Sequence, residues 1–212
     1  MDAIEAILNR KVQRAFANKP VETEKLSKIV EAGRHAMSAR NLQPWQFIVV
    51  RDRERLKAMG AVCTTGRFVA DAPSAVVILK DTANARWADV DCAQAVQNMA
   101  TAGWALGLGT CWVGNFDAAK LAEMLAIPDG WAVFTILPFG YADEKNPPQG
   151  KPLKKRTEMV HYERYGQTKA TGPASVSCVR WETASEGYRR SVGSASADRV
   201  NDALATGAPE ES

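Results

Sequence analysis

Near the start of the chain, apolar residues repeat every three or four positions, the spacing of one helix face. Ile4, Ile7 and Leu8 form one such stripe, which Asp2 can cap with Glu5 as its capping-box partner. A second stripe follows the proline at position 20, and two more follow aspartates that can act as helix caps. Helices are predicted over residues 3–10, from after 20 to about 35–37, 53–59, 88–106 and 117–126.

Between these helices lie short runs rich in Val, Ile, Phe and Trp, which are typical of strands. The run 75–79 is apolar on both faces, so it is predicted to lie in the centre of a sheet. The alternation of helices with strands favours a three-layer sandwich around one central sheet. Strands are predicted over residues 45–50, 75–79, 110–113 and 131–137.

The helix predicted over residues 88–106 differs from the others because it is apolar nearly all round. Val90, Val96 and Trp104 mark one stripe, whereas Met99 lies on the opposite side. Such a helix is buried on several sides, either in a core or in an interface between subunits.

The texture of the chain changes near residue 166. Residues 1–166 are dense in periodic segments, whereas Ala, Ser, Gly, Thr and Pro supply more than half of residues 167–212. A segment so poor in large apolar residues cannot offset the entropy of its own ordering. We therefore predict a domain over 1–166 and a tail over 167–212 that is either disordered or an arm ordered by a partner subunit.

Composition excludes several classes of protein. The chain has 212 residues with 27 basic and 24 acidic side chains, and a net charge of +3 gives no strong field for nucleic acid or an anionic membrane. Two histidines and four cysteines without CxxC spacing argue against a metal site and against disulfides. No segment reads as a signal sequence or a membrane span, so we expect a cytoplasmic protein.

Two segments in the first quarter of the chain carry candidate chemistry. Arg10, Lys11 and Arg14 lie within five residues and could bind a phosphate dianion, although alone they are more typical of a basic helix end. Asn41 and Gln43 lie on a loop before Pro44, and their amides could both donate to and accept from the edge of a heterocycle. Ordinary loop chemistry remains the alternative.

Two further segments lie later in the chain. In 107–114 the glycines let the backbone approach a flat ligand, and Trp112 and Val113 could cover a ring; the alternative is a helix stop before a strand. Cys111 in this segment lacks a neighbouring base and is interpreted as an inert buried thiol. A basic run at 151–156 could bind phosphate or form a solvated face.

The order of these segments is more specific than any one of them, and the chain resembles the nitroreductase family of FMN-dependent oxidoreductases over residues 4–166. The matching segments are Arg10-Lys11-Val12-Gln13-Arg14-Ala15-Phe16, Asn41-Leu42-Gln43-Pro44-Trp45, Gly107-Leu108-Gly109-Thr110-Cys111-Trp112-Val113-Gly114, Leu137-Pro138-Phe139-Gly140-Tyr141 and Val160-His161-Tyr162-Glu163-Arg164-Tyr165-Gly166.

This resemblance implies an α+β three-layer sandwich whose central sheet is mixed and mostly antiparallel, and a homodimer with FMN at the subunit interface. It also implies roles for individual residues. Arg10 would hold the FMN phosphate and Arg14 would approach the pyrimidine edge of the flavin. The cofactor-binding set expected on these grounds is Arg10, Lys11, Val12, Arg14, Ser38, Ala39, Asn41, Gln43, Trp112, Val113, Gly114, Lys154 and Arg156.

Within this set, Ser38, Ala39 and Asn41 would come from the partner subunit, and a backbone N–H of the segment 112–114 would lie near flavin N5. Val12 departs from the family pattern, which usually has a serine there. The basic residue near 151–156 that completes the phosphate site is not assigned uniquely among Lys154, Lys155 and Arg156.

The implied activity is hydride transfer from NADH or NADPH to FMN, and then to a small electron-poor acceptor such as a nitroaromatic, quinone or enone, with ping-pong kinetics. No catalytic acid–base side chain and no metal are required. Reductive dehalogenation, flavin fragmentation and non-catalytic flavin binding remain alternatives. The segment 60–71 is a candidate substrate lid that would decide among the enzymes.

Overall fold

The computed structural model describes residues 1–83, 85–148, 150 and 152–169. The chain divides into a first unit, Met1–Lys151, and a second unit, Pro152–Ser212. Most of the tail predicted over 167–212, with Cys178, lies outside the described residues. The predicted boundary after residue 166 therefore stays a prediction.

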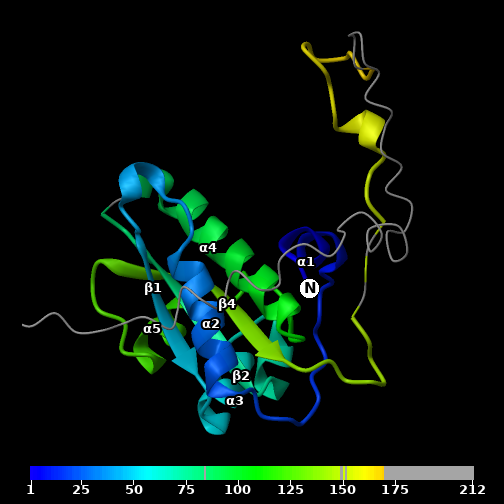
Figure 1. Cartoon of the computed structure of the whole chain (residues 1–212). Helices are drawn as coiled ribbons and strands as arrows, with labels where there is room; N and C mark the ends of the chain where they lie inside the picture. The colour runs from blue at the N-terminus through cyan, green and yellow to red at the C-terminus, as the bar shows by residue number, and fades with distance from the viewer. Residues whose placement is uncertain (84, 149, 151, 170–212) are drawn as a thin grey trace, which may run out of the picture. The chain divides into compact units, whose positions relative to one another are not determined.

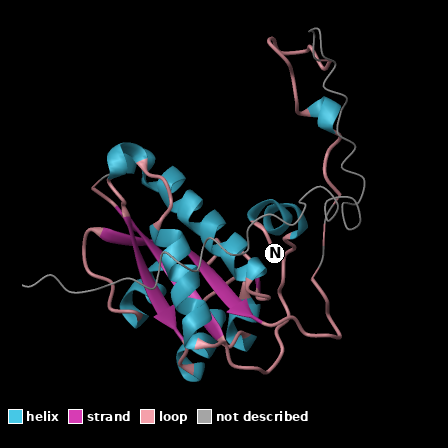
Figure 2. Cartoon of the chain, in the orientation of Figure 1, coloured by secondary structure: helices cyan, strands magenta, loops and turns pink. Residues whose placement is uncertain are grey.

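The first unit has five α-helices and four strands among its described residues, in the order that the sequence predicts (Figures 1 and 2). The helices are α1 (Ala3–Asn9), α2 (Thr23–Arg34), α3 (Arg53–Ala61), α4 (Ala85–Ala105) and α5 (Ala118–Met124). The strands are β1 (Trp45–Val50), β2 (Ser74–Asp81), β3 (Gly109–Thr110) and β4 (Trp131–Gly140). The 3-10 turns are Ala39–Asn41, Arg67–Asp71 and, in the second unit, Arg156–Glu158.

Helix starts follow the predicted caps. The side chains of Asp2, Asp52 and Asp117 each accept a hydrogen bond from the backbone N–H three residues later. Each bond satisfies one of the donors that the first turn of a helix leaves unpaired.

The four strands form one sheet in the order β1-β2-β4-β3, and every neighbouring pair is antiparallel. The only parallel pairing described is a single bridge between Val12 and Thr110 beside β3. The architecture is therefore α+β with an antiparallel sheet.

Alternate residues of β2 feed two separate cores, which explains why this strand is apolar on both faces. Val76 and Ile78 pack with α2 and α4 on one face of the sheet. Val77 and Leu79 pack with α3 and α5 on the other. The two helical layers on either side of the sheet in Figure 2 confirm the predicted three-layer sandwich.

Helix α1 is the exception to this inward packing. Ile4, Ile7 and Leu8 share a face as predicted, yet each is more than half exposed. The helix lies beside α4, whose own Trp87 and Val90 are also about half exposed. Both helices therefore expose apolar surface in the first unit.

Candidate functional site

The extended segment after α1 is attached to β3. Val12 forms the parallel bridge with Thr110, and the backbone N–H of Gln13 donates to the Thr110 carbonyl at 3.0 Å. Successive side chains of an extended segment point to opposite sides. Gln13 is accordingly buried whereas Arg14 reaches the surface, where it lies beside the segment that follows β3.

The segment that follows β3 is fixed to the sheet through Val113. Its backbone N–H and carbonyl both pair with Ile136 of β4, at 3.1 and 3.2 Å. The hydroxyl of Thr135 donates to the same carbonyl at 2.9 Å. Val113 is 3% exposed and therefore forms a rigid wall.

A third segment, which follows α3, closes the site from the other side. Thr64 donates its backbone N–H to the Asn115 carbonyl at 3.0 Å, so this segment runs along the one that contains Val113. A Cβ added to Gly66 would lie 2.2 Å from a γ-methyl of Val113. Only glycine permits so close an approach.

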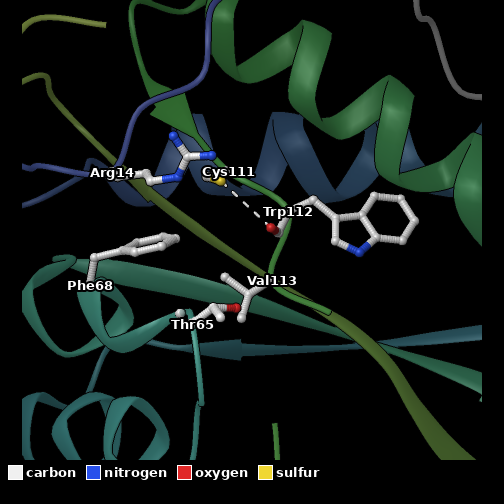
Figure 3. Close-up of a pocket in the computed structure, with 7 residues that line it drawn as sticks. Arg14, Thr65, Phe68, Cys111, Trp112 and Val113 are labelled. Carbon is white, nitrogen blue, oxygen red and sulfur yellow. Dashed lines mark hydrogen bonds between the residues drawn. The ribbon is translucent and has the colours of Figure 1, made fainter. Parts of the chain in front are cut away.

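These three segments surround a cavity of about 140 Å³ (Figure 3). It is lined by Arg14, Thr65, Gly66, Phe68, Cys111, Trp112 and Val113. Arg14 is the one charged residue among the described residues of this lining, and Phe68 and Val113 supply apolar surface. A cation beside apolar walls suits a flat ligand that has an electron-rich edge.

Trp112 contributes to this cavity differently from Val113. Its indole is 46% exposed and meets the ring of Phe134 edge-on, with the centroids 5.2 Å apart. In Figure 3 the indole points away from Phe68, and a Cβ on Gly114 would lie 3.1 Å from the indole nitrogen. The main chain of Trp112, more than its ring, therefore faces the space between Arg14 and Phe68.

Arg10 and Lys11 stand at the end of α1. Arg10 is the C-cap residue, and its backbone N–H donates to the Ala6 carbonyl at 3.1 Å. Its Nε is buried with no hydrogen-bond partner among the described residues, although buried polar groups are normally paired. Lys11 is exposed. The segment thus holds one donor in need of an acceptor beside a second cation.

The loop 38–43 is held in an unusual conformation. Arg40, Asn41 and Gln43 have φ of 54°, 57° and 49°, which places three residues other than glycine in the left-handed region. The Ser38 hydroxyl accepts the Gln43 backbone N–H at 3.0 Å, and the Asn41 amide oxygen accepts the Gln43 side chain at 3.1 Å. Such strain is concentrated at functional sites and needs anchoring.

Asp91 of α4 provides an anchor. Its carboxylate is 3% exposed and accepts the backbone N–H of Ala39 at 3.2 Å. Because Asp91 lies in the amino half of α4 and Arg14 lies beyond its carboxyl end, roughly 20 Å of helix separates the two regions. One copy of the chain does not gather the loop 38–43 and the Arg14 cavity into one site.

Lys154 and Arg156 belong to the second unit, which is described separately. Both are exposed, and Arg156 donates to the Tyr162 hydroxyl at 3.4 Å. Their expected role at a phosphate stays a prediction.

The buried thiols of the first unit are poor nucleophiles. Burial raises the pKa of Cys63 to about 11. Burial also raises the pKa of Cys92 to about 12, with a smaller contribution from Asp89 and Asp91. Cys111 is 7% exposed and its Sγ–H donates to the Trp112 carbonyl at 3.5 Å. A thiolate is the reactive form, so these environments favour structural roles.

Sequence reasoning did not place Thr65, Gly66 and Phe68 at the cavity, although they fall within the predicted lid segment 60–71. It also missed Gln13, which lies inside a quoted motif but was given no role. In the sequence, Gly66 is only a glycine between two predicted elements. Because such glycines are common, the sequence could not single it out. The sequence did not indicate the role of Asp91, because its carboxylate bonds to Ala39, which lies 52 residues earlier in the chain.

Two absences hold for the part of the chain that the structure describes. It contains no cluster of three or more acidic, histidine or cysteine side chains placed to hold a metal ion. None of its helices combines the length and the apolar character needed to cross a bilayer.

The chain is similar to known proteins over most of its first unit. The model of the Nitroreductase family matches residues 7–66 and 61–141. A relative from Archaeoglobus fulgidus, whose provisional name is NADH dehydrogenase/NAD(P)H nitroreductase, is 35% identical over 155 residues, which are 68% of this chain and 88% of the relative. A similarly named relative from Methanothermobacter thermautotrophicus is 36% identical over 152 residues, and the match covers 68% of this chain and 79% of that relative.

Solved structures have the same fold. An FMN-dependent nitroreductase from Clostridium difficile superposes with a TM-score of 0.69 at 29% identity. The superposition covers 76% of this chain and 99% of the Clostridium difficile chain. A structure from Parabacteroides distasonis, with the same provisional name as the archaeal relatives, has a TM-score of 0.70 at 31% identity, covering 77% of this chain and 98% of its own.

Proposed function

The chain belongs to the nitroreductase family, and from this premise we propose that two copies of it bind FMN and pass hydride from NAD(P)H to a small electron-poor acceptor. Relatives are named NAD(P)H nitroreductase and FMN reductase, which supports an NAD(P)H-dependent oxidoreductase that uses FMN. We assign the activity to residues 1–166.

The observation that carries this proposal is Arg14 facing Val113 and Phe68 across one cavity. A flavin has a broad apolar ring and a pyrimidine edge that gains negative charge on reduction. The apolar side chains fit the ring, and the guanidinium supplies the positive charge that its edge needs. The residues present therefore fit the cofactor.

The neighbouring cations fit the phosphate of FMN. Arg10 holds a buried Nε without an acceptor among the described residues, and Lys11 adds a second positive charge one residue later. Val12 brings no hydroxyl to this site, so we assign phosphate binding to the charged side chains of Arg10 and Lys11.

When bound, FMN supplies the hydride chemistry, and the protein orients and tunes it. The positive charge of Arg14 would raise the electron affinity of a flavin bound beside it. The Val113 N–H is already bonded to Ile136, so Trp112 and Gly114 are the candidates for a backbone donor near flavin N5. The site has no need of a side chain that transfers protons. Because one cavity would serve donor and acceptor in turn, we expect ping-pong kinetics with a nitroaromatic, quinone or enone.

We infer the dimer from what one copy lacks. A cavity of about 140 Å³ is smaller than the ligand pockets of about 300–1,000 Å³ that hold small molecules. The loop with Ser38, Ala39, Asn41 and Gln43 lies at the other end of α4 from that cavity. Two copies packed antiparallel along α4 would place the loop of each beside the cavity of the other, which makes two equivalent sites.

The test begins with the purified full chain. We expect a yellow protein that releases FMN on heating and oxidises NADH or NADPH when menadione or a nitroaromatic is supplied. A colourless protein that FMN does not reconstitute would overturn the proposal. A yellow protein that oxidises neither nicotinamide with any acceptor would favour non-catalytic flavin binding instead.

A further inference from the structure

Gln13 is buried more completely than any other side chain of its segment, at 1% exposure. Glutamine is seldom buried unless its amide is paired. Here the amide nitrogen donates to the carbonyl of Ala15 and, at 3.1 Å, to the carbonyl of Asn146. The amide oxygen is buried without a partner among the described residues, so the amide nitrogen alone makes the hydrogen bonds of this side chain.

These bonds hold the main chain on both sides of Arg14. Before it, the Gln13 backbone N–H is fixed to the Thr110 carbonyl at 3.0 Å. After it, the Gln13 amide holds the Ala15 carbonyl, which also accepts the Asp143 backbone N–H at 3.2 Å. A residue held on both sides has little freedom to move its Cα.

The niche for Gln13 is built into β3. A Cβ added to Gly109 would lie 2.4 Å from the Cβ of Gln13, so any larger residue at 109 would expel the glutamine. Gly109 and Thr110 lead directly into Cys111 and Val113, which line the cavity opposite Arg14. One side chain thus connects the two walls of the site.

We propose that Gln13 is a positioning residue, which sets the place of the Arg14 guanidinium against the Cys111–Val113 wall and thereby tunes the reduction potential of the bound flavin. This inference rests on the proposed function. Gln13 would act only through Arg14, since Gln13 itself does not line the cavity.

The experiment is a double-mutant cycle on the FMN-loaded full chain, read as the midpoint potential of FMN and its dissociation constant. Gln13→Met keeps the length of the side chain and removes the amide, whereas Gln13→Glu keeps its shape. We expect Gln13→Met to lower the preference for reduced over oxidised FMN roughly threefold, about 14 mV for a two-electron couple. In an Arg14→Ala background the same change should have no further effect.

The control is Ser74→Ala, which removes another buried side-chain hydrogen bond, from Ser74 to the Phe139 carbonyl at 2.9 Å. It should lower the melting temperature and leave the potential unchanged. If Gln13→Met does not fold, Gln13→Leu takes its place. If Arg14→Ala does not retain FMN, Arg14→Gln, which also removes the positive charge, takes its place.

The inference is overturned if the Gln13 variants shift the potential equally with and without Arg14, or lower only the melting temperature. It is also overturned if Arg14 itself does not influence the potential. Failure of the chain to bind FMN at all would instead remove the proposed function, so the two failures are distinguishable.

Discussion

Arg14 and Lys11 lie three residues apart and carry the same charge, but only Arg14 lines the cavity. We expect Arg14→Ala to weaken FMN binding about tenfold or to slow flavin reduction by NAD(P)H, because a charge-assisted contact is lost. Lys11→Ala should cost much less, because Lys11 does not line the cavity. Flavin fluorescence titration and stopped-flow reduction would measure both. Equal and negligible effects would remove Arg14 from the site.

Gly66 lies close against Val113, which leaves no room for a larger side chain at position 66. Gly66→Ala would place a Cβ 2.2 Å from Val113, so the wall 64–68 must move away. Overpacking of this kind costs about 1–3 kcal/mol, or a fall of several degrees in melting temperature for a chain of this size. Thermal unfolding of Gly66→Ala, Val113→Ala and the double variant would measure it. We expect Val113→Ala to restore part of the loss, and simple addition of the two losses would contradict the contact.

At the scale of single residues, the sequence proposed site residues through motifs. The structure explains why the role of some motif residues was accessible from the sequence and that of others was not. Arg14 could be proposed beforehand because its charge and its spacing from Arg10 stand in the local sequence. The need for Gly109 and Gly140 could not, because it arises from Gln13 and Phe16, which approach them from distant segments. Close approaches between remote residues leave no local pattern.

Among the elements, α4 does more than fill the core, because its Asp91 anchors the strained loop 38–43. Asp91→Ala would leave the Ala39 N–H unpaired and remove this anchor from three left-handed residues. We expect faster amide hydrogen exchange over 38–43 and a lower melting temperature. Hydrogen exchange read by mass spectrometry would locate the change.

The matched control is Asp89→Ala on the same helix. Asp89 is exposed and pairs with Lys80 at 2.6 Å, without contacting the loop. It should change neither the exchange of residues 38–43 nor FMN binding. Exchange over the loop that is equally fast in both variants would mean that Asp91 is not the anchor.

Elements with strong local signals were predicted closely. The strand 45–50 has the bounds of β1, and three helices begin after their predicted aspartate caps. The strand predicted over 131–137 instead continues to Gly140 through Pro138. Pro138 lies between the pairings of Phe139 with Thr110 and of Ile136 with Val113, where the neighbouring segment is interrupted. A proline without an N–H is tolerated there, and only the tertiary pairing reveals it.

For the whole molecule, the exposed apolar face of α1 supports the proposed dimer. Periodicity predicted that Ile4, Ile7 and Leu8 share a face, but it could not show whether that face turns inward or outward. Each of the three is more than half exposed in the first unit. This exposed apolar face suits a second copy.

Ile7→Glu tests this surface. A carboxylate at the centre of an apolar interface would be buried unpaired, so we expect a monomer that has lost most of its FMN. Light scattering coupled to size exclusion would give the mass, and absorbance of the same peak would give the flavin content. Val49→Glu is the control, because Val49 has a comparable exposed fraction, 43% against 52%, but lies on β1. A dimer that survives Ile7→Glu would place the interface elsewhere, and a monomer that keeps its FMN would show that one copy alone completes the site.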